Sequence, residues 1–192
     1  MKLLVGISGG SGLIYGVRTL EVLRRLGVER HLIFSTAAKQ TLVLETDYSV
    51  EDVEGLATKN YRFNDITAAP ASGSFKTDGM VVVPCSMKTL AGIASGYSDN
   101  LLLRAAETTL KERRRLVLVP RETPLTSIHI ENMLRVTQAG GIVVPATPGF
   151  YLRPRSVDDI VNHIVGKVLD LFGLEHGLYE PWTGPPKARR GK

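Results

Sequence analysis

Residues 2–26 read KLLVGISGGSGLIYGVRTLEVLRRL, and this stretch indicates the fold. A short apolar run, Lys2–Ile7, leads through a turn rich in glycine and serine into an amphipathic helical pattern, Leu13–Leu26. A buried strand that passes through a tight turn into a helix is typical of the first half of a βαβ unit. The rest of the chain repeats this alternation.

The alternation predicts a doubly wound α/β domain with a mostly parallel sheet and helices on both faces, in a Rossmann-like or flavodoxin-like three-layer arrangement. We expect the further strands at Arg30–Ser35, Met80–Pro84, Leu116–Pro120 and Ile142–Pro145. We expect the further helices at Thr36–Glu45, Ser49–Ala57, Ser86–Ala94, Asn100–Arg114, Ser127–Gln138 and Ser156–Phe172. The twenty residues Lys59–Asp78 are rich in Ala, Ser, Gly and Pro and are expected to form one long irregular loop, which in a compact domain is usually functional.

Length and composition favour one globular domain over residues 1–192, with 43% hydrophobic and 22% charged residues. The single cysteine, Cys85, excludes an internal disulfide and any multi-cysteine zinc or iron–sulfur site, and the four histidines show no metal-ligand spacing. We therefore expect no metal. The first apolar run is too short for a signal peptide, and no stretch has the length of a membrane helix, so we expect a cytoplasmic protein without a membrane span.

The net charge of +5 belongs largely to the end of the chain. Four basic residues and no acid stand in the last six positions, so the remainder carries about 5 − 4 = +1; the four are Lys187, Arg189, Arg190 and Lys192. This pattern predicts an extended basic tail from about residue 180. It does not predict a nucleic-acid-binding face, which would carry its basic surplus on the folded domain.

Polar residues and glycines follow every predicted strand. Because the carboxyl ends of parallel strands lie along one edge of the sheet, these segments are expected to form the ligand site. They are Ser8–Gly12, Ser35–Thr36, Pro84–Thr89, Pro120–Pro124 and Pro145–Tyr151.

The first of these turns can hold a phosphate or an electron-rich ring, because its glycines let the backbone approach a ligand. Its glycines, at positions 6, 9, 10 and 12, fit neither the dinucleotide fingerprint nor a P-loop. A tight turn without a ligand is the alternative. Ser35, Ser86 and Thr89 likewise fit a ligand site or simple helix caps.

Two charged residues follow the fourth strand. Arg121, between two prolines, is placed to bind a phosphate, and the neighbouring Glu122 can act as a general acid or base. Arg104, Lys111 and Lys167 are further cations expected near the same edge, and the alternative is that Lys111 and Lys167 are solvated surface lysines. Cys85 is more often a packing residue than a nucleophile in such a setting.

Several ordered blocks, from about Leu3 to Leu174, resemble the UbiX-type flavin prenyltransferases, earlier described as phenylacrylic or polyprenyl-hydroxybenzoate decarboxylases. The blocks are Gly9–Gly12, Glu45–Asp47, Ala69–Ser74, Pro84–Ser86, Arg104–Ala106, Leu110–Arg114, Leu118–Glu122, Ile130–Met133 and Pro148–Tyr151.

The resemblance implies an enzyme that joins a dimethylallyl group, from dimethylallyl monophosphate or diphosphate, to N5 and C6 of reduced FMN without a metal. It also implies that the prenylated FMN passes to a UbiD-type decarboxylase. The family resemblance further suggests a large homo-oligomer built from trimers, with the active sites at subunit junctions.

The resemblance assigns roles to individual residues. The residues implied to contact FMN are Gly9, Gly10, Ser11, Ser35, Ser86, Met87, Lys88, Thr89 and Arg121. Those implied to bind the prenyl phosphate are Lys111, Arg121, Tyr151 and Lys167, with Arg104 as a further cation. Glu122 resembles the acid–base glutamate of the family, and Ser11 and Glu45 resemble its polar pair near N5.

One departure from the family pattern is Ile66, where some members carry an aromatic residue that can stabilise an allylic cation. Two alternatives remain open at this point. An FMN-dependent cysteine-type decarboxylase would need a catalytic loop histidine, and no histidine occurs between His31 and His129. A non-catalytic flavin carrier for a partner decarboxylase is the other alternative.

Overall fold

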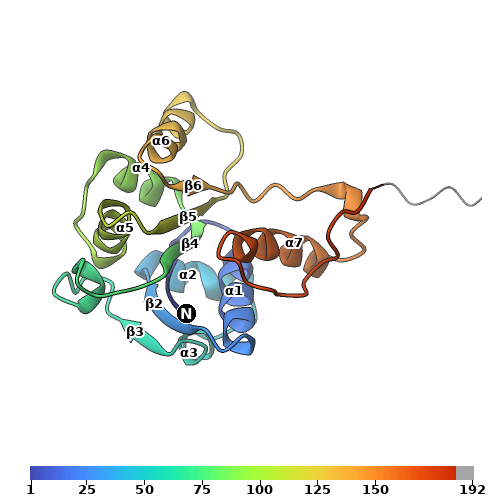
Figure 1. The fold of residues 1–192 in the computed structure, drawn as a ribbon, viewed down its shortest axis with the longest axis horizontal. Helices are drawn as coiled ribbons and strands as arrows, with labels where there is room; N and C mark the ends of the chain where they lie inside the picture. Colours follow the sequence, from blue (N-terminus) through green and yellow to red (C-terminus); the bar gives the residue numbers. More distant parts are fainter. Residues whose placement is uncertain (185–192) are drawn as a thin grey trace, which may run out of the picture.

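The computed structural model describes residues 1–184, so the four basic tail residues named above lie outside the described residues. The described chain forms one sheet with helices on both faces (Figure 1). The strands are β1 (Lys2–Ile7), β2 (Glu29–Phe34), β3 (Lys59–Tyr61), β4 (Gly79–Cys85), β5 (Arg115–Pro120) and β6 (Ile142–Val143).

The sheet has the order β3-β2-β1-β4-β5-β6, and every pair is parallel. The doubly wound fold predicted from the sequence is therefore confirmed. Without the short edge strand β3, the order is that of flavodoxin; with β3 it is the Rossmann order. The strand order reverses between β1 and β4, which is where ligands bind in such sheets.

The prediction of one irregular loop over Lys59–Asp78 is wrong at two places. Lys59–Tyr61 pairs with β2 as an edge strand, and Ala69–Ala71 forms a 3-10 turn, η1. The edge strand has three largely exposed residues, so its sequence carries no apolar alternation that would reveal it.

Seven α-helices connect the strands of the described chain. They are α1 (Leu13–Arg25), α2 (Thr36–Glu45), α3 (Val50–Gly55), α4 (Met87–Ser95), α5 (Leu101–Lys111), α6 (Ser127–Gln138) and α7 (Val157–Asp170). The helix expected over Asn100–Arg114 ends at Lys111, and the backbone of Arg113 then takes a left-handed φ of 57°.

Alternating strand residues build two cores, one on each face of the sheet. Leu3 and Val5 of β1 face α1, α2 and α7, whereas Leu4 of β1 and Met80 of β4 face α4, α5 and α6. This alternation follows from the two-residue period of a strand and completes the three layers.

The chain after β6 extends away from the sheet to a 3-10 turn, η2 (Phe150–Leu152), before α7 runs back along α1 (Figure 1). A guanidinium nitrogen of Arg25 donates a 2.7 Å hydrogen bond to the carbonyl of His176, which fastens the segment after α7 to α1. Within residues 1–184, no helix is both long and apolar enough to cross a bilayer.

Candidate functional site

A cavity of about 370 Å³ lies at the carboxyl edge of the sheet, beside the point where the strand order reverses. Its walls come from the turns after β1, β2 and β4 and from the start of α5. The lining residues are Ser8, Gly9, Ser35, Thr36, Ala37, Phe63, Ser86, Lys88, Thr89, Asn100 and Leu103.

Three helices begin at this cavity, each with a capping side chain. Ser35 accepts a hydrogen bond from Ala38 N at 3.1 Å, Ser86 from Thr89 N at 3.3 Å, and Asn100 from Leu103 N at 3.1 Å. Helix N-termini attract anions through their free N–H groups and their dipoles. The serines are thus both caps and cavity walls, and the site suits a phosphate.

The glycine-rich turn after β1 packs directly on two of these helices. A Cβ on Gly9 would lie 2.7 Å from Ala37 Cβ, and one on Gly10 would lie 3.4 Å from Ser86 Cα. Ser8 ties the turn to β4, because its hydroxyl donates to Pro84 O at 3.1 Å and accepts from Ser86 N at 2.8 Å. The turn is a close-packed cradle beside the cavity.

Ser11, Glu45 and Arg121 converge at the N-terminus of α1. Glu45 Oε2 accepts hydrogen bonds from Gly12 N at 2.8 Å and Leu13 N at 3.1 Å, while Arg121 Nε donates to Ser11 O at 3.3 Å. Partial burial opposes ionisation of Glu45, but the Ser11 hydroxyl, these two N–H groups and Arg121 together hold the pKa of its carboxyl below the usual value. The structure therefore brings the sequence-predicted pair Ser11 and Glu45 together.

Glu122 lies in a second cavity of about 210 Å³, at the carboxyl end of β5. Arg121 lines the same cavity, with Leu125, Met133 and the turn after β6 on the other side. Glu122 Oε1 accepts a 3.1 Å hydrogen bond from Thr123 N.

Tyr151 and Lys167 lie together in a third cavity, of about 320 Å³, formed by η2, α7 and the segment after α7. The Tyr151 ring meets the edge of Trp182 at a centroid distance of 5.6 Å. Lys167 Nζ donates to Asp170 Oδ2 at 3.4 Å. Neither residue lines the first cavity or the second cavity, which holds Arg121 and Glu122.

The expectation that Lys111 lies near the carboxyl edge of its own sheet is wrong. Lys111 ends α5, which leads into the first residue of β5, whereas Arg121 follows the last residue of β5. Six residues of strand separate the two ends, about 20 Å. Lys111 Nζ instead donates to Glu112 at 2.6 Å.

Two other predicted site residues, Arg104 and Met87, make contacts within the chain, and their ligand contacts stay predictions. Arg104 Nε donates to Ala71 O at 3.2 Å and its NH1 to Glu107 at 2.9 Å, so it already has partners in the chain. Met87 packs against the core beneath α4 instead of lining the first cavity. Its role in FMN binding stays a prediction.

Sequence reasoning missed several residues of these cavities. Asn100 gives a recognisable signal, an Asn before an apolar helix, but that helix follows another helix, α4, and not a strand, so a search at strand ends does not find it. No local sequence pattern marks the cavity residues Phe63, Asp170 and Trp182. They reach the cavities through contacts between segments that lie far apart in the sequence.

Neither the single cysteine nor a metal-ligand cluster forms part of the three cavities within residues 1–184. Complete burial raises the pKa of the Cys85 thiol, so it stays protonated in the core. Within residues 1–184, no three side chains of His, Cys, Asp or Glu gather as a possible ligand set for a metal ion.

Comparisons with known proteins show the family to which the chain belongs. Residues 1–169 match the family model described as Flavoprotein. The chain is 54% identical over 190 residues to a probable UbiX-like flavin prenyltransferase of Escherichia coli O157:H7, covering 98% of this chain and 96% of the relative.

Two solved structures are also similar. The AnUbiX (PadA1) complex with FMN and dimethylallyl pyrophosphate superposes with a TM-score of 0.95 at 49% identity, covering 96% of this chain and 98% of the other. A dodecameric FMN-dependent UbiX-like decarboxylase of E. coli O157:H7 gives 0.94 at 54% identity, covering 96% and 100%. The FMN-dependent cysteine decarboxylase TvaF, at 19% identity and a TM-score of 0.60 over 74% of this chain and 88% of its own, shares the fold alone.

Proposed function

Because the chain belongs to the Flavoprotein family and, within it, to the UbiX-like flavin prenyltransferases, we propose that its sheet-edge cavity holds reduced FMN and that Arg121 and Glu122 act on the prenyl donor. The chain is an enzyme, and FMN is the flavin on which it acts.

The FMN phosphate is proposed to lie at the three helix N-termini. These N-termini and the close-packed glycine turn are the observation that carries the proposal, because together they provide N–H groups, a positive dipole and room for the ligand. The ring system would then extend along Gly9 and Gly10 toward Ser11, Glu45 and Arg121. When bound, the reduced flavin supplies the nucleophilic ring atoms N5 and C6.

The prenyl phosphate is proposed to lie between subunits. Lys111 lies about a strand length from Arg121, and Tyr151 and Lys167 line a different cavity, so one chain does not assemble all four donors around one anion. A second and third copy can supply them if their outer surfaces cover the open edge of the first. We propose a homo-oligomer built from trimers, with the active sites at the subunit junctions.

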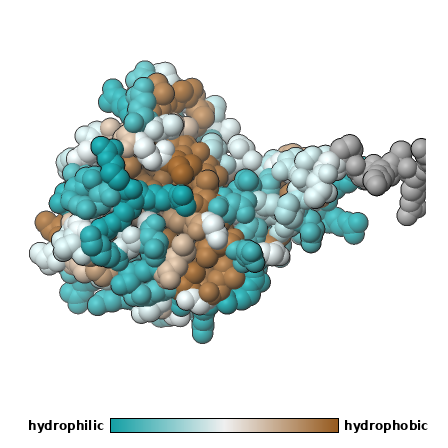
Figure 2. All heavy atoms as spheres, in the orientation of Figure 1, coloured by the Kyte–Doolittle hydropathy of each residue, from teal (hydrophilic) through white to brown (hydrophobic). Residues whose placement is uncertain are grey.

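The surface of the single chain supports such assembly. Figure 2 shows apolar side chains gathered in a band through the middle of one face, extending from α6. Three apolar residues of α6 are more than half exposed, namely Ile128, Ile130 and Leu134. Exposed apolar surface of this kind is typical of protein interfaces.

The donor set suits cleavage of an allylic phosphate. Arg121, Lys111, Lys167 and the Tyr151 hydroxyl would hold the phosphate as it leaves with its bonding electron pair, and charge on it is best stabilised by fixed donors in a water-poor site. Glu122 is proposed to transfer a proton at the departing phosphate. Ser11 and the Glu45 carboxylate would hold or accept a proton at the flavin edge beside them.

Ile66 stands where some family members carry an aromatic residue, so this position offers no π face to stabilise an allylic cation. The exposed pair Tyr151 and Trp182, which adjoins Lys167, can provide one when it packs against a neighbouring subunit. We propose that this pair takes over the role.

The product is proposed to pass to a UbiD-type decarboxylase, and the cytoplasmic location predicted from the sequence stays a prediction. The decisive experiment supplies reduced FMN and dimethylallyl monophosphate under exclusion of oxygen and records the mass of the flavin. A flavin heavier by one five-carbon unit supports the proposal. Unchanged flavin that remains bound would indicate a carrier, and carbon dioxide release from a peptidyl cysteine would indicate the decarboxylase.

A further inference from the structure

His163 of α7 is a buried residue whose side chain fixes the backbone ahead of Tyr151. Only 7% of His163 is exposed, and its Nδ1 accepts a 3.1 Å hydrogen bond from Gly149 N. Gly149 immediately precedes η2, which carries Tyr151. The imidazole therefore holds the loop that presents the tyrosine.

The packing around Gly149 is tight. A Cβ at this position would lie 2.6 Å from Cε1 of Tyr151 and 3.2 Å from Cε1 of His163. The Tyr151 ring also meets the His163 ring edge-on, at a centroid distance of 6.1 Å. Tyr151 thus folds back over Gly149 onto the imidazole, and its position depends on that contact.

The hydrogen bond from Gly149 also fixes the tautomer of His163. Because the Nδ1 lone pair accepts an N–H, the proton of the neutral ring lies on Nε2. Nε2 is buried, and within residues 1–184 it has no hydrogen-bond partner. A buried donor without an acceptor is costly, so a residue with only a packing role would be better served by an apolar ring.

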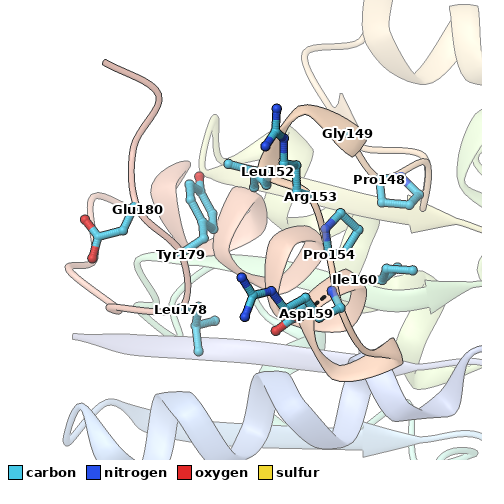
Figure 3. A pocket seen from close by; sticks show the side chains of 11 residues that line it. Pro148, Gly149, Leu152, Arg153, Pro154, Asp159, Ile160, Leu178, Tyr179 and Glu180 are labelled. Atoms are coloured by element: carbon cyan, nitrogen blue, oxygen red, sulfur yellow. Dashed lines mark hydrogen bonds between the residues drawn. The ribbon is translucent and has the colours of Figure 1, made fainter. Parts of the chain in front are cut away.

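The groups that face His163 come from three elements. Lys167 stands one turn further along α7, on the same face, and Tyr151 comes from η2. Tyr179 comes from the segment after α7, and its ring centroid lies 5.3 Å from that of His163. The Tyr179 hydroxyl donates a hydrogen bond to Asp170. Gly149 and Tyr179 both line a cavity of about 310 Å³ beside this segment. Figure 3 shows the Tyr179 side chain and the backbone at Gly149.

Protonation of His163 conflicts with this arrangement. A proton on Nδ1 would face the N–H of Gly149 and break the hydrogen bond. Burial, and secondarily the positive charge of Lys167, lower the pKa of His163 below the usual histidine value. Within the described chain no carboxylate contacts the ring to offset these effects.

We propose that His163, as a neutral imidazole, is a positioning residue that fixes Tyr151 beside Lys167 for recognition of the prenyl phosphate. This inference rests on the proposed function of Tyr151 and Lys167. His163 itself touches neither substrate; it acts through the backbone N–H of Gly149 and the ring of Tyr151.

Two substitutions separate the hydrogen bond from the packing. His163→Phe keeps a ring of similar size but removes the acceptor, and His163→Asn keeps an acceptor at the δ position without an ionisable ring. We expect His163→Phe to raise KM for dimethylallyl monophosphate about fivefold, the effect of one lost hydrogen bond, with kcat and FMN affinity nearly unchanged. His163→Asn is expected to restore most of the loss in KM.

A second readout does not depend on turnover. Trp182 is the single tryptophan of the chain and lies against Tyr151, so its emission reports the position of that ring. In the wild-type protein, the emission should change as the pH falls below about 6.5 and His163 takes up a proton. This change should vanish in His163→Asn and persist in His176→Asn, the matched control that removes the other imidazole near the cavity.

The outcomes distinguish the two proposals. If the wild-type enzyme forms no prenylated flavin, the proposed function fails, while the emission of Trp182 still tests the positioning role. The positioning role is overturned if His163→Phe has the wild-type KM, if His163→Asn is as impaired as His163→Phe, or if the emission change persists in His163→Asn.

Discussion

The carboxylate of Glu45, the last residue of α2, accepts a 2.8 Å hydrogen bond from the backbone N–H of Gly12, just before the first turn of α1. Gly12 itself has a left-handed φ of 102° and offers no capping side chain, so Glu45 caps α1 from another helix. The same carboxylate lies near Ser11 and Arg121. Glu45 thus caps the turn after β1 and places a negative charge beside it.

Glu45→Gln should therefore lower both stability and activity. We expect a loss of about 1 kcal/mol at pH 7, because a charged acceptor at a helix N-terminus is exchanged for a neutral one. The folded-state pKa of Glu45 is depressed, so its contribution is complete above the unfolded-state pKa and is lost as pH falls through the folded-state value. Thermal melts of both proteins should differ at pH 7 and converge as the pH falls through the depressed folded-state pKa of Glu45.

Glu122→Gln should leave FMN bound and nearly abolish product formation. Glutamine keeps the shape and the acceptor for Thr123 N but cannot exchange a proton, so we expect a loss of about 10²–10⁴ in kcat. Flavin absorbance during titration checks binding, and single-turnover product analysis checks the chemistry. Near wild-type turnover would remove Glu122 from the mechanism.

Gly9→Ala should weaken FMN binding, because its Cβ would lie 2.7 Å from Ala37 Cβ at the start of α2 and force the turn away from the cavity. We expect a stability loss of about 1–3 kcal/mol, typical of overpacking. Gly55→Ala is the control, since a Cβ there meets nothing within 4 Å. Equal FMN affinity in Gly9→Ala and wild type would contradict a close-packed cradle.

The protein should bind FMN in preference to NAD. The glycine turn lacks the dinucleotide spacing, and three helix N-termini surround a cavity of about 370 Å³, suited to one phosphate. Calorimetric titration with each ligand decides the matter. Tighter binding of NAD would refute the placement of the flavin phosphate at α2, α4 and α5.

Much of the first cavity, where we propose that FMN binds, was predictable because several of its residues directly follow strands. Ser35 and Ser86 stand at strand ends in the sequence and at helix N-termini in the structure, so local reasoning found them. Asn100 was missed because it follows a loop rather than a predicted strand. Lys111 was misplaced because proximity in sequence to β5 conceals that α5 delivers it to the opposite edge of the sheet.

The aromatic cluster around Tyr151 was beyond sequence reasoning. The segment after α7 returns to lay Trp182 and Tyr179 beside η2 and α7, and no periodicity encodes such a return. Gly166 permits it, since a Cβ there would lie 2.4 Å from the Tyr179 ring. Only the three-dimensional arrangement reveals that His163 and Tyr151 are in contact.

The central claim, that one chain holds FMN while other chains supply donors to the prenyl phosphate, is tested most directly by subunit mixing. Glu122→Gln and Lys167→Ala subunits, each with its own affinity tag, are co-expressed and the mixed oligomers are purified through both tags. Turnover is measured at a dimethylallyl monophosphate concentration where each variant alone is nearly inactive. We predict that the mixed oligomers regain activity, because some sites combine Glu122 of one chain with Lys167 of another. Mixed oligomers no more active than either variant alone would contradict a site shared between subunits.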